Sequence, residues 1–160
     1  MSCDVAAAAF FLFASAAPAP AGHAPMLQPV VASAPPSVSQ EPLFKDIVGR
    51  AGALKAQVEA FRGKVGQSAT PLALSDFELF SGLVSQLSTL DEQGHMTLLQ
   101  RGAPDDLKCI LHGISQDLIV KLGAVKAAKT GHDQDLALRD MAYLLNDNVE
   151  VITAPPQPAA

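Results

Sequence analysis

The apolar residues in the stretch from residue 44 to residue 65 recur at alternating gaps of three and four positions. They are Phe44, Ile47, Ala51, Leu54, Val58, Phe61 and Val65. This spacing places all seven side chains on one face of an α-helix, and such a face is stable only when it is buried against other helices. The pattern therefore predicts a helical bundle.

Start and stop signals predict the second helix and a break in it. Residues 75–78 read Ser-Asp-Phe-Glu, a capping box in which the serine and the glutamate satisfy exposed amides of the first turn. An apolar stripe follows at Phe77, Phe80, Val84 and Leu87. A second box at residues 89–92 and a glycine at position 94 predict a break near Ser88 or Gly94, followed by one short extra helix.

Two more helices are expected in the C-terminal half. Proline at position 104 and two acids after it favour a helix start, and Gly131 is suited to end that helix in the left-handed conformation. The last helix is predicted from about residue 133 to residue 145, ended by the polar run 146–148. Glycines inside helices are interpreted as points of close helix approach, at Gly49, Gly52, Gly113 and Gly123.

Composition supports the same fold class. Only 5% of the residues are aromatic and there is no tryptophan, so the core must consist mainly of Leu, Val, Ile and Ala. That composition favours helix-on-helix packing over a β-sandwich. We predict an all-α fold over residues 42–148, a small antiparallel bundle of four main helices with the short extra helix as an optional fifth.

The chain outside the bundle divides into three segments. Residues 1–16 are strongly apolar and end in a small-residue site, like a secretory signal peptide, but no basic residue precedes the apolar run. The alternatives are an uncleaved membrane-associated segment and a disordered apolar tail. Residues 17–41 are rich in Pro and Ala and predict a linker, and residues 149–160 predict an extended, Pro-rich tail.

Charge restricts the class of partner. The net charge of -5 argues against a nucleic-acid binder, which needs a basic surface. Residues 42–66 hold five basic and two acidic residues, whereas residues 67–160 hold six basic and twelve acidic ones. The basic first helix either complements its acidic neighbours within the domain or contacts an anionic partner such as a membrane surface.

Cys109 and His112 are the first candidates for metal ligands. They lie three residues apart on the helix predicted to start at position 104, so both side chains can share a face and ligate zinc or copper. A structural zinc site needs about four ligands, and the further candidates are His95, His132 and scattered carboxylates. The competing interpretation places Cys109 at the edge of the core as a small hydrophobic residue, with His112 at the margin.

No catalytic, phosphate-binding or cofactor motif is recognisable in the sequence, so we predict no cofactor and no enzymatic activity. The leading hypothesis is an exported protein of the periplasm or cell envelope that acts through a protein partner, as an adaptor, inhibitor or immunity-like protein. The alternatives are a metal- or ligand-binding bundle, and a membrane-associated protein that uses its apolar leader. The apolar face of the first helix suits a monomer core or a dimer seam equally well, which leaves the oligomeric state open.

Overall fold

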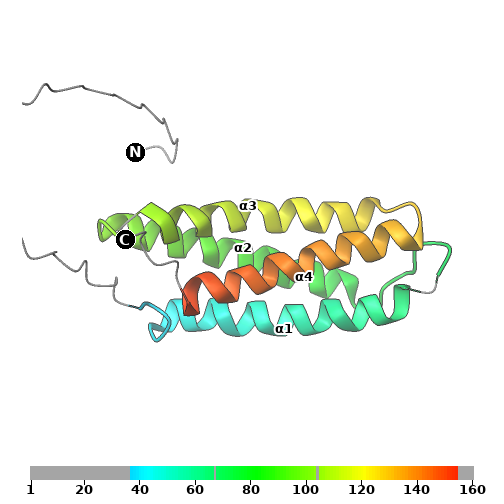
Figure 1. Cartoon of the computed structure of the whole chain (residues 1–160), viewed down its shortest axis with the longest axis horizontal. Helices are drawn as coiled ribbons and strands as arrows, with labels where there is room; N and C mark the ends of the chain where they lie inside the picture. The colour runs from blue at the N-terminus through cyan, green and yellow to red at the C-terminus, as the bar shows by residue number, and fades with distance from the viewer. Residues whose placement is uncertain (1–36, 67, 104, 155–160) are drawn as a thin grey trace, which may run out of the picture. The chain divides into compact units, whose positions relative to one another are not determined.

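The computed structural model describes residues 37–66, 68–103 and 105–154. Four helices and no strands occur among these residues: α1 (Pro42–Val65), α2 (Phe77–Gln100), α3 (Asp105–Ala127) and α4 (Gly131–Thr153). The helices lie side by side with their long axes roughly aligned (Figure 1). The predicted all-α bundle is therefore confirmed. The apolar leader 1–16, most of the linker 17–41 and the end of the tail lie outside the described residues.

Each helix packs against the helices before and after it in the chain, and α1 packs against α4. The chain reverses direction between successive helices, so neighbours run antiparallel (Figure 1). Helices α1 and α3 lie across one diagonal of the bundle and α2 and α4 across the other. None of the described helices is long and apolar enough to span a membrane.

The core confirms the apolar stripe from which the bundle was predicted. All seven stripe residues of α1 are buried, and they meet apolar residues of the other three helices. Two aromatic rings anchor the end of the bundle where α2 begins, because Phe61 and Phe80 pack edge to face with centroids 5.4 Å apart. The largest fully buried side chains include Phe44, Phe80, Ile47, Leu87, Leu111, Leu118, Leu138, Met141, Leu145 and Ile152.

The predicted break in the second helix is wrong, because α2 is continuous from Phe77 to Gln100. Gly94 lies in the core rather than at a break. A Cβ atom on it would lie 3.2 Å from Leu111 Cδ1 and 3.3 Å from Phe44 Cε1, so the missing side chain makes room for α1 and α3. The predicted capping box is also absent, since the N-cap is Asp76 at φ 59° and makes no side-chain cap hydrogen bond.

The predicted boundary between the last two helices is wrong as well. Gly131 does not end α3, which stops at Ala127, but opens α4. Thr130 caps α4, accepting a hydrogen bond from the Asp133 amide at 3.0 Å. The polar run 146–148 does not end α4 either, because the helix continues to Thr153 with Ile152 fully buried.

The interpretation of the exposed helical glycines is corrected too. A Cβ atom on Gly49, Gly52, Gly113 or Gly123 would meet nothing within 4 Å, so none of these glycines is a point of close helix approach. Close approach occurs instead at Gly94, described above, and at Gly131. At Gly131 a Cβ atom would overlap the backbone carbonyl oxygen of Ser68.

Charge complementarity within the domain accounts for part of the basic first helix. Arg62 of α1 donates from Nε to Asp135 of α4 at 3.1 Å, and Lys55 donates to Asn146 of α4 at 2.7 Å. Asp135 therefore forms its ion pair across the bundle, with a residue of α1.

One polar pair crosses the diagonal of the core. Asp91 of α2 and Asn148 of α4 are both fully buried, and Asn148 Nδ2 donates to Asp91 Oδ2 at 2.8 Å. The remaining oxygens, Asp91 Oδ1 and Asn148 Oδ1, have no hydrogen-bond partner within the described part of the chain. Burial raises the pKa of Asp91 to about 7, although the hydrogen bond from Asn148 acts in the opposite direction. The carboxyl group therefore keeps its proton until the pH approaches 7.

Candidate metal centre

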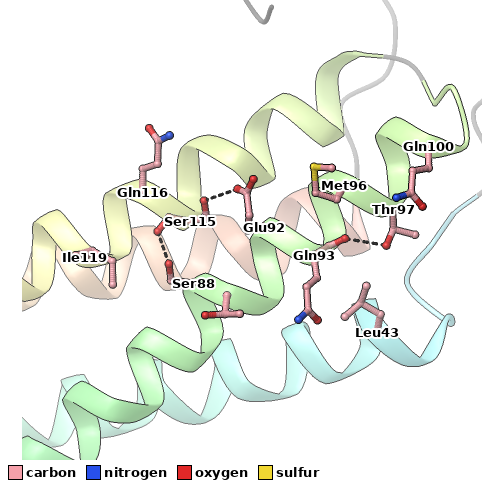
Figure 2. A pocket seen from close by; sticks show the side chains of 11 residues that line it. Leu43, Ser88, Glu92, Gln93, Met96, Thr97, Gln100, Ser115, Gln116 and Ile119 are labelled. Atoms are coloured by element: carbon pink, nitrogen blue, oxygen red, sulfur yellow. Dashed lines mark hydrogen bonds between the residues drawn. The ribbon is translucent and has the colours of Figure 1, made fainter. Parts of the chain in front are cut away.

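The surface between α2 and α3 carries a groove of about 740 Å³, which we call the α2–α3 groove. Figure 2 shows Glu92 near its middle, with Ile119 towards one end and Met96, Thr97 and Gln100 towards the other. Helix α2 supplies most of the lining because its polar face points outward here. The groove is lined by Leu43, Ser88, Thr89, Glu92, Gln93, Met96, Thr97, Gln100, Ser115, Gln116 and Ile119.

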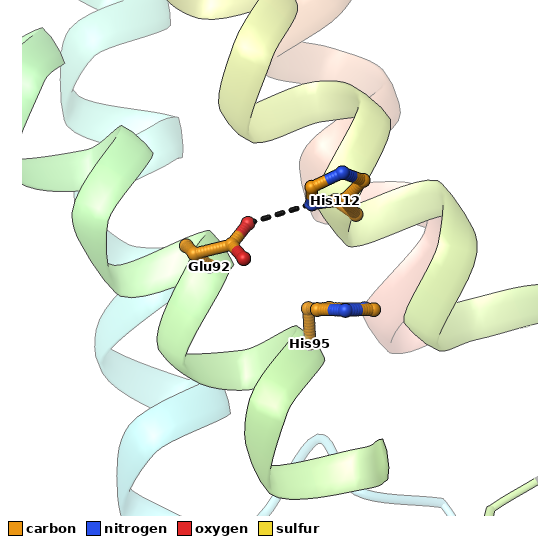
Figure 3. A group of neighbouring side chains, drawn as sticks. All are labelled: Glu92, His95 and His112. Atoms are coloured by element: carbon orange, nitrogen blue, oxygen red, sulfur yellow. Dashed lines mark hydrogen bonds and ion pairs between the residues drawn. The ribbon is translucent and has the colours of Figure 1, made fainter. Parts of the chain in front are cut away.

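Glu92 also belongs to a group of potential metal ligands, which we call the α2–α3 cluster. Its other members are His95, one turn further along α2, and His112 on α3 (Figure 3). One ligand atom from each of the three side chains lies within 4.8 Å of the other two. The spacing of Glu92 and His95 places both on one face of α2, and the antiparallel neighbour α3 brings His112 beside them.

His112 and Glu92 form the closest contact in the cluster. The distance from His112 Nδ1 to Glu92 Oε2 is 2.8 Å. The hydrogen bond from His112 is the main cause that lowers the pKa of Glu92, with a further contribution from Ser115. Glu92 is therefore ionised at neutral pH, and since a carboxylate only accepts hydrogen bonds, Nδ1 of His112 carries the shared proton.

The orientation of His95 is fixed by the backbone of the facing helix. Its Nδ1 lies 2.7 Å from the carbonyl oxygen of Lys108. A carbonyl only accepts, so Nδ1–H is the donor, and in the neutral ring the lone pair remains on Nε2. A histidine whose second nitrogen donates to a backbone carbonyl is the usual arrangement of a metal ligand, because the hydrogen bond fixes both the tautomer and the ring plane.

Four further contacts hold the cluster in place. The rings of His95 and His112 lie 4.8 Å apart, centroid to centroid. Gln116 Nε2 lies 2.9 Å from His112 Nε2, on the opposite side of the ring from Glu92. Ser115 donates to Glu92 Oε2 at 3.1 Å and to the backbone oxygen of His112 at 2.7 Å. The Ser115 hydroxyl therefore donates to a carboxylate and to a carbonyl. A serine nucleophile is activated by a hydrogen bond to a base such as an imidazole, and this hydroxyl is not directed at one.

The sequence identified two of the three cluster residues. His95 and His112 were candidates, and the structure brings them together, whereas Cys109 is half-buried and is not part of the cluster. His132, on α4, is not part of it either. Glu92 was interpreted only as a residue of a helix start. The signal that identifies it is the Glu-x-x-His spacing of residues 92–95, which is one half of a motif that helical metal sites use in pairs.

The exposure of the cluster leaves it open to ions from solution. The side chains of His112 and Glu92 are 39% and 42% exposed, so an ion can reach them without opening the bundle.

Searches with protein-family models, among curated proteins and among solved structures find no match for this chain.

Proposed function

We propose that this protein binds a divalent transition-metal ion at the α2–α3 cluster. The observation that carries the proposal is the convergence of two imidazoles and one ionised carboxylate within 4.8 Å of one another. Imidazole and carboxylate together suit zinc, copper, nickel and ferrous iron, and sites with two histidines and one carboxylate leave coordination positions open. The donor set alone does not choose among these metals, so zinc serves as the test ion.

The helices supply the ligands with little rearrangement. Glu92 and His95 are fixed on one helix, and His95 Nε2 is available because Nδ1 donates to the Lys108 carbonyl. At His112 the metal ion takes the place of the proton between Nδ1 and Glu92 Oε2. The ring proton then moves to Nε2, and a rotated Gln116 amide accepts it through its oxygen. Each ligand thus keeps a hydrogen-bonded partner after the ion has bound.

Zinc affinity is expected to depend on the cluster and not on histidine content in general. In a competition titration against a chromophoric chelator, using the full chain without an affinity tag, one zinc ion should bind per chain. Replacing His112 with alanine should weaken binding at least about tenfold, because it removes one of three ligands.

The matched control is His132→Ala, which removes an exposed histidine on α4 outside the cluster. This variant should bind zinc as the parent chain does. Circular dichroism checks that both variants keep their helices. Equal affinities in His112→Ala and His132→Ala would contradict the proposed site, as would the absence of zinc binding by the parent chain.

The exported adaptor, inhibitor or immunity-like role stays a prediction from segments 1–16 and 17–41. Export is measured by expressing the chain in a bacterial host and determining the mass of the product in each cell fraction. A periplasmic product that begins near residue 17 would support it. An intact cytosolic or membrane-bound product would favour the membrane-associated alternative instead.

A further inference from the structure

The α2–α3 groove extends on both sides of the proposed metal site. Its lining runs along α2 from Ser88 to Gln100, a distance of about 18 Å at the rise of an α-helix. Its volume of about 740 Å³ lies in the range of small-molecule sites. Glu92 belongs both to the cluster and to the groove, so an ion held by the cluster would lie beside the groove.

The hydroxyl groups along the groove are already engaged. Ser88 donates to the Ser115 carbonyl at 2.7 Å, and Thr97 donates to the Gln93 carbonyl at 2.8 Å (Figure 2). Thr89 likewise donates to the carbonyl of Ser85 at 3.1 Å. These donors point into the protein and are not available to a polar ligand. The groove therefore offers few hydroxyl donors for specific recognition of a sugar or another polyhydroxylated molecule.

Apolar side chains are exposed on both sides of Glu92. Met96 is 44% exposed and Ile119 is 47% exposed, and the partly buried Leu43 of α1 extends the apolar surface beyond Met96. Covering such side chains with an apolar chain removes their surface from water and is favourable. The body of a ligand that fits this groove is therefore apolar.

The charge of the groove determines the head group. Among the described residues that line the groove, Glu92 is the only charged one. With neutral histidines, a divalent ion and one carboxylate leave a single net positive charge, which a single anionic group neutralises. The part of the lining that the structure describes contains no lysine or arginine to hold a second acidic group or a phosphate. A monoanion is thus the complementary ligand.

We propose, building on the metal site of the preceding section, that the α2–α3 groove binds a monocarboxylate with an unbranched apolar chain. The carboxylate takes the open coordination position of the metal ion held by Glu92, His95 and His112. From there the chain extends in one direction along the groove, over Ile119. Metal ion and groove thus form one composite site, in which neither part alone binds the ligand tightly.

The test begins with zinc alone and then adds the carboxylate. Octanoate, acetate and octanol are each titrated by calorimetry into the full chain loaded with one equivalent of zinc, and octanoate is also titrated into the metal-free chain. Octanoate should bind the zinc-loaded protein at least about tenfold more tightly than acetate, since burying two methylenes suffices for that factor. Octanol with the zinc-loaded chain, and octanoate with the metal-free chain, should each bind at least about tenfold more weakly than octanoate binds the zinc-loaded chain.

Groove variants separate the two halves of the site. Ile119→Ser should weaken octanoate binding at least about threefold and leave zinc affinity unchanged, because Ile119 contributes only apolar surface. Val120→Ser is the matched control, since Val120 is 65% exposed on the same helix and does not line the groove. This control should bind both zinc and octanoate like the parent chain.

The outcomes distinguish the two proposals. A chain that binds no zinc overturns the metal site and the composite site with it. A chain that binds zinc but binds octanoate no better than acetate overturns only the groove proposal. Equal octanoate affinity with and without zinc contradicts the role of the metal ion in holding the carboxylate, and equal effects of Ile119→Ser and Val120→Ser contradict the role of the groove.

Discussion

Replacing Asp91 with asparagine is expected to raise the free energy of unfolding at pH 8 by about 3 kcal/mol. The pKa of this buried carboxyl is about 7 in the folded chain, compared with 3.8 for an aspartate in the unfolded chain. Between these values the unfolded chain binds fewer protons than the folded chain, so stability falls as the pH rises. That loss amounts to about 4 kcal/mol at pH 8, and asparagine does not incur it.

The amide also completes the hydrogen bonding of the pair. Asparagine at position 91 can still accept from Asn148 Nδ2 through its oxygen, and its amide nitrogen can donate to Asn148 Oδ1, which has no partner beside the ionised Asp91 among the described residues. Urea unfolding of both chains at several pH values between 4 and 8 measures the effect. The advantage of the variant should grow with pH and level off above the pKa of Asp91.

The control for this prediction is Asp117→Asn, which removes an exposed carboxylate from α3. Like most surface substitutions, it should change the free energy of unfolding at pH 8 by no more than about 0.5 kcal/mol. A destabilised Asp91→Asn chain at pH 8, or an unchanged pH dependence in that variant, would mean that Asp91 is ionised in the folded core at no cost.

Replacing Gly131 with alanine is expected to lower the free energy of unfolding by about 2 to 3 kcal/mol. The added Cβ atom would overlap the carbonyl oxygen of Ser68 and lie 2.8 Å from its carbonyl carbon. These are backbone atoms and cannot rotate away, so the loop between α1 and α2 has to move. That movement also strains the hydrogen bond from the Gly131 amide to Ala69 O, 3.4 Å long in the native chain.

Gly113→Ala is the matched substitution at an open position. A Cβ atom on Gly113 would meet nothing within 4 Å, and the residue lies in the interior of α3. Alanine should raise the free energy of unfolding there by up to about 1 kcal/mol, through helix propensity and reduced freedom of the unfolded chain. If thermal or urea unfolding shows the same effect for both substitutions, the contact of α4 with the loop does not exist in solution.

The helical bundle could be predicted because burial of an apolar stripe leaves a periodic signal. The seven residues of the α1 stripe recur at helical spacing, and all seven are buried. Helix ends were harder to place, because tertiary contacts outweigh local signals there. The polar run 146–148 resembles a helix end in the sequence. In the structure Asn148 is buried and donates a hydrogen bond to Asp91, so the helix continues through the run.

The glycines illustrate the same limit. A glycine in a helical pattern indicates either tolerance at the surface or room for a neighbouring helix, and sequence alone does not separate the two. Gly94 and Gly131 are needed for packing, whereas Gly113 faces open space. The difference depends on which side of the helix faces the core, and neighbouring positions differ by about 100° around the helix axis.

Only the two histidines of the candidate site could be predicted, for a related reason. His95 and His112 stand out by residue type, since the chain contains four histidines in all. Glu92 is one of sixteen acidic residues and stands out only by its position one turn before His95. The contact between Glu92 and His112 joins residues twenty positions apart and depends on the register between α2 and α3, which no local pattern specifies.

The most direct test of the metal site is a crystal structure of the full chain grown with zinc, with anomalous scattering measured at the zinc absorption edge. The strongest anomalous peak is expected between α2 and α3, about 2.0 to 2.2 Å from a Glu92 oxygen and from one nitrogen each of His95 and His112. A peak at His132 or elsewhere on the surface, with none between α2 and α3, would contradict the assignment of Glu92, His95 and His112 as a metal centre.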